Sequence, residues 1–317
     1  MAQPATPVGR FLKRARLAVQ QPLEYAAMLL VQLTGSLLPI AWASAIGGAL
    51  ARTVGPLTGR SRRARRALAQ AFPERTAAEV AAIERDMWEN LGRTIFEYAK
   101  LAPLRPQPRE SAGAGARAVI DGAAAIAALR DDGRPGLVFS AHYGNWELVT
   151  AAVRGQGIHP LHLIYRPANN PMIDAHVRRL QRGNDVTLHA KGAQGARGLL
   201  GAMHAGAHAI MLVDQRMNDG IAVPFLGRPA MTAPAVAQLA LKYGAPLLPV
   251  RAERLRDARG RFTCRFRIVA EPAIAAVATG DRAGDVAATM ALVNGAIERW
   301  VRADPAQWLW IHNRWGN

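Results

Sequence analysis

The stretch Leu137-Val-Phe-Ser-Ala-His142-Tyr-Gly-Asn145-Trp-Glu147-Leu148 contains the change from strand to helix that decides the fold. Its apolar start predicts a buried strand, and the small residues that follow predict a tight turn. Asn145 is a residue type that caps helices well, so a helix is expected to begin near it. This order places His142 at the carboxyl end of a strand, where open α/β sheets bind their ligands. Glu147 then lies in the first helical turn and can face back toward the imidazole.

The chain after about residue 118 alternates between strand and helix patterns in the same way. Strands are predicted at 118–121, 136–141, 160–165, 208–214, 246–253 and 262–270, and helices at 122–131, 145–155, 171–183, 193–204, 232–243 and 284–302. Such alternation is typical of an α/β fold with a mixed, largely parallel sheet flanked by helices. Upstream, Thr76-Ala-Ala-Glu79 is a capping-box pattern that predicts a further helix reaching about Leu101. One catalytic domain is therefore expected over residues 56–317.

The composition restricts the possible partners. The 317 residues include 40 basic and 23 acidic side chains, which gives a formal net charge of +17, and 36 of the basic residues are arginine. A chain this basic is expected to bind anions, and no helix-turn-helix, zinc-finger or RNP-type motif points to nucleic acid. The single cysteine, Cys264, excludes an intramolecular disulfide and a multi-cysteine zinc site, and it fits a reducing compartment.

A region of 26 uncharged residues from Tyr25 to Leu50 predicts a hydrophobic membrane anchor, within a basic tail and anchor segment that covers residues 1–55. As a helix it would be roughly 39 Å long, which exceeds the ~30 Å hydrocarbon core of a bilayer. Because arginines flank it on both sides, a helix lodged in one leaflet is favoured over a simple span. A cleaved signal peptide ending near Ala43-Ser44-Ala45 and a buried core helix are the alternatives. The arginine run over residues 60–66 is expected to touch anionic lipid headgroups.

A histidine paired with a carboxylate has a specific chemical use. The carboxylate accepts one ring N–H, which fixes the tautomer and leaves the other nitrogen as a general base. Such a base can take the proton of an alcohol that attacks a carbonyl carbon, and donors at a helix N-terminus can stabilise the oxyanion. The pattern His142-x4-Glu147 is short by itself, and a structural histidine beside a helix cap is the alternative. Asp214 ends a second apolar strand, Ala209–Val213, and is expected at the same edge of the sheet as His142.

Four blocks in this order resemble the lipid A biosynthesis (lauroyl/myristoyl) acyltransferase family, within the larger group of acyltransferases that share a His-x4-Asp/Glu motif. The first block is Ser140–Leu148, which contains His142 and Glu147 at that spacing. The others are Tyr165–Asn170, Val213–Gln215 followed by Val223–Thr232, and Trp308–Trp315. The tryptophans at 300, 308, 310 and 315 are interpreted as core anchors, as a belt at a membrane interface, or as both.

The resemblance implies a glycerolipid acyltransferase-like fold and direct transfer of a fatty acyl chain from an acyl carrier protein thioester to a hydroxyl of a lipid A precursor. By the same resemblance, His142 is the general base and Glu147 orients it, while Arg166 binds substrate phosphate or steadies the oxyanion. The remaining residues that are expected to contact substrate are Asn145, Asn169, Asp214, Gln215 and Thr232.

No metal or organic cofactor is expected. His204 and His208 have no carboxylate between them, and Cys264 is interpreted as a strand residue rather than a nucleophile. The expected partners are the acidic carrier protein, the phosphorylated glycolipid acceptor and an anionic membrane surface, with the catalytic domain on the cytoplasmic face of the inner (plasma) membrane. Two alternatives stay open: another acceptor, such as a lysophospholipid or a glycosylated inositol lipid, and a non-catalytic lipid-binding protein on the same fold.

Overall fold

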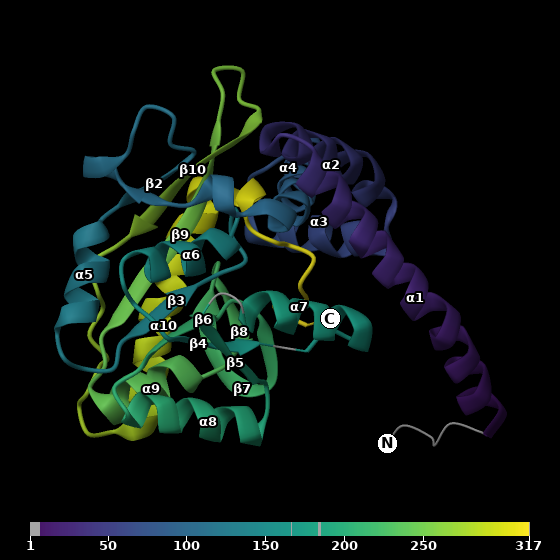
Figure 1. Ribbon diagram of the computed structural model, residues 1–317. Coiled ribbons are helices and arrows are strands. Elements are labelled where there is room, and N and C mark those ends of the chain that lie inside the picture. Colours follow the sequence, from purple (N-terminus) through teal and green to yellow (C-terminus); the bar gives the residue numbers. More distant parts are fainter. Residues whose placement is uncertain (1–6, 166, 183–184, 317) are drawn as a thin grey trace.

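An eight-stranded sheet forms the centre of the computed structural model, which describes residues 7–165, 167–182 and 185–316 (Figure 1). Neighbouring strands are parallel except for one antiparallel pair, which confirms the prediction of a mixed, largely parallel sheet. In order across the sheet, the strands are β1 (Gln107–Pro108), β2 (Ala118–Asp121), β10 (Phe262–Ala270), β9 (Leu247–Arg256), β3 (Leu137–Ser140), β6 (His208–Leu212), β4 (Leu161–Tyr165) and β5 (Val186–Ala190). The antiparallel pair is β9 with β10.

Helices cover both faces of the sheet because its central strands are apolar on both sides. In β3, Leu137 and Phe139 belong to one buried core, and Val138 belongs to the core on the opposite face. Burial on both faces explains why this strand is a continuous apolar run. The first core includes residues of α8 (Ala193–His204), α9 (Ala235–Tyr243) and α10 (Arg282–Ala303), and the second includes residues of α5 (Ala123–Asp131) and α6 (Glu147–Gly155).

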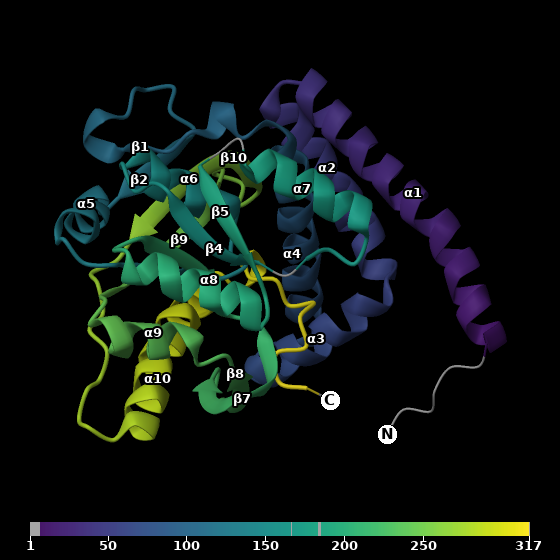
Figure 2. The same cartoon turned by 60° about the horizontal axis from the view of Figure 1, so that its bottom comes forward.

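Four helices from the first third of the chain pack beside the sheet: α1 (Pro7–Leu37), α2 (Ile40–Val54), α3 (Gly59–Ala71) and α4 (Ala77–Glu97) (Figure 2). Helices α2 and α4 approach closely because glycine occupies the crossing, where a Cβ on Gly92 would lie 2.1 Å from the carbonyl oxygen of Gly47. The predicted capping box of Thr76 and Glu79 begins α4. Helix α7 (Pro171–Arg182) contacts α1, and short 3₁₀ turns lie at Gly55–Leu57, Tyr98–Lys100, Ala102–Leu104, Arg109–Ser111 and Pro305–Gln307.

The hydrophobic region predicted as one anchor helix is divided between two helices. Helix α1 ends at Leu37, α2 begins at Ile40, and Pro39 stands at the N-cap of α2. Proline has no N–H and disfavours a helical conformation in the preceding residue, so it separates the two helices. No helix in the described part of the chain is long and apolar enough to cross a membrane. One face of α2 is buried in the protein, as the core-helix alternative predicts.

The sequence patterns missed four strands: the two-residue edge strand β1, the edge strand β5 and the two strands of a hairpin. The edge strand β5 has half-exposed side chains and therefore lacks a continuous apolar run. A separate antiparallel hairpin joins β7 (Arg216–Phe225) to β8 (Arg228–Thr232), with Leu226 and Gly227 at its turn in the left-handed region, at φ of 50° and 73°. Residue 232 therefore ends a hairpin, and α9 begins three residues later than predicted.

Candidate active site

Glycine and the segment that follows α10 hold the turn after β3. Gly144 has a φ of +57°, and a Cβ there would lie 1.7 Å from the carbonyl oxygen of Ala252, so only glycine fits. The Gly144 N–H donates to the carbonyl of Gln307 at 2.9 Å, and the Leu309 N–H donates to the carbonyl of His142 at 3.0 Å. These contacts fix His142 at the carboxyl end of β3, where the sequence predicts it.

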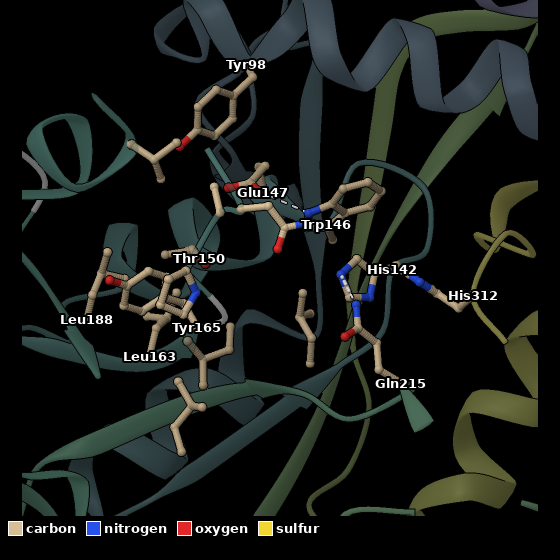
Figure 3. A pocket seen from close by; sticks show the side chains of 17 residues that line it. Tyr98, His142, Trp146, Glu147, Thr150, Leu163, Tyr165, Leu188, Gln215 and His312 are labelled. Atoms are coloured by element: carbon tan, nitrogen blue, oxygen red, sulfur yellow. Dashed lines mark hydrogen bonds between the residues drawn. The ribbon is translucent and has the colours of Figure 1, made fainter. Parts of the chain in front are cut away.

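The carboxylate that holds the imidazole of His142 belongs to Asp214. His142 Nδ1 lies 2.9 Å from Asp214 Oδ1, and the His142 backbone N–H donates to Oδ2 at 3.0 Å. Trp308 Nε1 donates to the same Oδ2 at 2.8 Å. Because an ionised carboxylate only accepts hydrogen bonds, we assign the ring proton to Nδ1 and the lone pair to Nε2. The side-chain amide of Gln215 lies 3.5 Å from that second nitrogen (Figure 3).

The two charges of this pair stabilise each other. Burial disfavours the protonated imidazole, but the charge and hydrogen bond of Asp214 outweigh burial, with a smaller contribution from Glu147, so the pKa of His142 is raised. Burial also opposes ionisation of Asp214, yet the charge and hydrogen bonds of His142 hold the pKa of this carboxyl below its usual value. The site therefore pairs an ionised acid with a histidine of raised basicity.

Glu147 lies in the first turn of α6, as predicted, but its carboxylate hydrogen-bonds Trp146 and not the imidazole. Its Oε1 accepts a hydrogen bond from Trp146 Nε1 at 3.0 Å, and burial raises the pKa of its carboxyl. The expectation that Glu147 orients the imidazole is corrected, because Asp214 makes that hydrogen bond. The adjacent parallel strands β3 and β6 bring His142 and Asp214 together at one edge of the sheet. Glu147 lines the same cavity as His142 and acts on the imidazole through its charge.

A cavity of about 580 Å³ opens beside His142 and Glu147 (Figure 3). Asn169 and Gln215, two of the predicted substrate contacts, lie in its wall. A cavity of this size, lined by both apolar side chains and several polar groups, is a candidate ligand site. Its apolar part includes Leu163, Ile164, Val177, Leu188, Ile210 and Leu212.

Three predicted substrate contacts, Asn145, Thr232 and Asp214, are buried in the protein instead of lining the cavity. Asn145 is fully buried, and its amide donates to Glu97 Oε2 at 2.8 Å. Thr232 is also fully buried, and its hydroxyl accepts a hydrogen bond from Arg314 Nη2 at 2.7 Å. The expectation that these side chains touch substrate does not fit this burial. Arg166 lies outside the described residues.

A buried ion pair between Arg254 and Glu97 supports the turn that follows β3. Arg254 of β9 donates through Nη2 to Glu97 of α4 at 2.8 Å, and through Nε to Asn90 Oδ1 at 2.7 Å. Both charged side chains are completely buried. Because Glu97 also accepts from Asn145, the pair connects the helical layer and the sheet to the residues around His142.

The segment after α10 contributes His312, to which the sequence assigned no role of its own. The His312 ring lies 4.8 Å from the His142 ring, and burial, together with the charges of His142 and Arg60, lowers the pKa of His312 to about 4. Trp308 and Trp310 are buried, which confirms their interpretation as core anchors. In the sequence, only its position within the Trp308–Trp315 block points to a functional role for His312. Cys264 is a buried residue of β10, as predicted, and burial raises the pKa of its thiol to about 12.

Comparison with known proteins gives a consistent result over the whole chain. The family described as bacterial lipid A biosynthesis acyltransferase matches residues 13–317. The lipid A biosynthesis palmitoleoyltransferase of Escherichia coli (strain K12) is 26% identical over 272 residues, which cover 84% of this chain and 81% of that protein. The lipid A biosynthesis acyltransferase of Shigella flexneri matches to the same extent.

Proposed function

Since the chain belongs to the bacterial lipid A biosynthesis acyltransferase family, we propose that it moves a fatty acyl chain from an acyl carrier protein thioester to a hydroxyl of a lipid A precursor. The observation that carries this proposal is the His142–Asp214 pair beside a cavity whose wall includes a group of apolar side chains. The apolar part of the wall suits a fatty chain, and a basic imidazole at the edge of the cavity suits activation of an alcohol.

In the proposed mechanism, His142 Nε2 accepts the proton of the acceptor hydroxyl while the hydroxyl oxygen attacks the thioester carbonyl carbon. Asp214 keeps Nδ1 protonated and stabilises the imidazolium that forms. The tetrahedral intermediate then collapses, the carbon–sulfur bond breaks, and the thiolate takes the proton back from Nε2. Glu147 adds negative charge near the imidazole, and Arg166 is retained from the family resemblance as the residue that steadies the oxyanion or binds phosphate. No acyl-enzyme is formed on this route.

We also propose that the protein acts at the cytoplasmic face of the inner membrane. Large apolar side chains are exposed along α1 and α2, among them Leu30, Leu33, Trp42 and Leu50. Exposed apolar surface of this extent is typical of membrane or protein interfaces. The exposed arginines of α3 supply positive charge that suits anionic lipid.

The substitution His142→Ala tests the proposed base. We expect it to lower kcat by at least about a hundredfold, because general-base catalysis typically contributes about 10²–10⁴ to the rate. Transfer of a labelled acyl chain from acyl carrier protein to a lipid A precursor is the measurement, with lysophospholipid as a second acceptor. His204→Ala is the matched control, since His204 is exposed at the end of α8. Near-normal turnover by the purified His142→Ala variant would refute the assignment of His142 as the base. Transfer by the wild type to the lysophospholipid, with none to the lipid A precursor, would refute the proposed acceptor.

A further inference from the structure

A second, polar pocket adjoins the catalytic cavity. It has a volume of about 420 Å³ and shares Gln215 and His312 with the cavity. Figure 3 shows His312 on the side of His142 that faces away from Leu163 and Leu188, and it shows Gln215 below the imidazole. The catalytic cavity and the polar pocket therefore meet beside the imidazole, at Gln215 and His312. The other residues of the polar pocket are Lys191, Arg216, Asn218, Asp219 and Asn313.

The two cations of the polar pocket are available to a ligand. Lys191 directly follows β5, and Arg216 is the first residue of β7; both are exposed. No ion pair with another described residue neutralises either side chain. The Arg216 guanidinium lies against the chain at Gly316, where an added Cβ would come within 2.6 Å of Nη1. Guanidinium and ammonium groups at such a site suit a phosphate oxygen.

The remaining groups of the polar pocket suit a sugar. Gln215, Asn218 and Asn313 each carry an amide that can both donate and accept, and Asp219 carries a carboxylate that accepts. Sugar hydroxyls need both kinds of partner. The arm of a carrier protein also contains a phosphate, but it has no ring of hydroxyls to match this set. His312 does not add a cation near neutral pH, because burial, with the charges of His142 and Arg60, lowers its pKa to about 4.

We propose that the polar pocket receives a phosphorylated sugar of the acceptor, whose phosphate is bound by Arg216 and Lys191, while the catalytic cavity receives the fatty chain. This inference rests on the proposed function and specifies where the acceptor lies. Gln215 borders both spaces and lies 3.5 Å from His142 Nε2, so a sugar hydroxyl that displaces its amide would meet the base. Phosphate recognition then becomes the determinant of acceptor specificity.

Kinetics with paired acceptors test the assignment. We expect Arg216→Gln and Lys191→Gln each to raise KM for a phosphorylated lipid A precursor about tenfold with little change in kcat, because the contact persists from ground state to transition state. With the same acceptor after phosphatase treatment, both variants should match the wild type. Arg259→Gln is the control, since Arg259 is an exposed arginine of the loop between β9 and β10 and lies outside both spaces. Equal losses on both acceptors, or a raised KM for the acyl donor alone, would overturn the proposal.

A binding measurement separates this proposal from the proposed function. The probe is the phosphorylated glucosamine disaccharide without acyl chains, titrated calorimetrically into the full-length protein and its Arg216→Gln variant. Binding by the wild type that weakens about tenfold in the variant supports the pocket even if turnover shows another natural acceptor. No binding by a wild-type protein that does acylate the precursor, or equal binding by the variant, would reject the pocket while leaving the proposed function intact.

Discussion

The imidazole of His142 has three ionisable neighbours with different effects. Asp214 accepts its Nδ1 proton, Glu147 contributes charge across the cavity, and the His312 ring packs against it at 4.8 Å. Because the pKa of His312 is lowered to about 4, its ring is neutral at the pH where His142 titrates. The ionised carboxylate of Asp214 therefore dominates the basicity of His142.

The raised pKa of His142 predicts the pH dependence of activity. The base works only when neutral, so kcat/KM should rise with pH along an acid limb that lies above the ordinary histidine value of 6.5. The effect on the stability of the fold has the opposite sign. The stabilisation that comes from the raised pKa of His142 is fully present below the unfolded-state pKa of histidine, and it is lost as pH rises through the folded-state pKa. We expect Asp214→Asn to move the acid limb to lower pH and to reduce kcat at least about a hundredfold. A pH–rate profile of both proteins is the measurement. An acid limb at the same pH in the two proteins would contradict the pairing of Asp214 with His142.

At this scale, the sequence located the proposed base but not the carboxylate that hydrogen-bonds it. His142 follows an apolar strand directly, so its position at the sheet edge could be predicted from neighbouring residues. Asp214 is 72 positions away, and only the parallel pairing of Ser140 with Leu212 brings it to the imidazole. The sequence could predict their common edge, but the choice between Asp214 and Glu147 depends on side-chain directions that no spacing encodes.

At the scale of secondary-structure elements, α4 and β9 depend on the Glu97–Arg254 pair. We expect Glu97→Gln to lower the free energy of unfolding by about 3–5 kcal/mol, because it leaves the buried charge of Arg254 uncompensated. Chemical denaturation is the measurement. Arg267→Gln is the control, since it breaks a partly exposed pair with Glu253 and should cost less than about 1 kcal/mol. Equal decreases in the free energy of unfolding of the two variants would show that the buried pair stabilises the fold no more than the partly exposed pair.

The same scale shows why some elements could be predicted and others could not. The capping box of α4 and the apolar run of β3 are local signals, and both elements form where they predict. Strand β5 and the hairpin β7–β8 carry mixed polar and apolar side chains, and their pairing partners rather than their own composition make them strands. The burial of Asn145 and Thr232 has the same origin, because their partners Glu97 and Arg314 are distant in sequence.

For the whole molecule, the exposed apolar side chains of α1 and α2 lie beside strongly basic segments. Leu30, Leu33 and Leu37 are exposed near the end of α1, and Trp42 and Leu50 are exposed on α2. The net charge of +17 adds long-range attraction to anionic surfaces, which salt screens. We expect the proposed attachment to a membrane surface to use both contributions.

Replacing the three leucines of α1 tests this attachment. We expect the combined variant Leu30→Ser, Leu33→Ser and Leu37→Ser to bind phosphatidylglycerol-containing vesicles at least about tenfold more weakly, since each leucine can contribute roughly 1–2 kcal/mol to partitioning. Co-sedimentation at two salt concentrations is the measurement, and thermal unfolding verifies the fold. Leu255→Ser is the control, because Leu255 is an exposed leucine of β9. Unchanged binding by the triple variant would exclude this face as the contact.

The order in which the chain is made gives the segment after α10 a further consequence. Trp308 completes the hydrogen bonds of Asp214, Leu309 binds the carbonyl of His142, and His312 covers one side of its ring. All three residues are translated after every strand of the sheet. A nascent chain in which this segment is still inside the ribosome lacks these three contacts, so we expect the His142–Asp214 pair to reach its final arrangement only after the segment that follows α10 has docked.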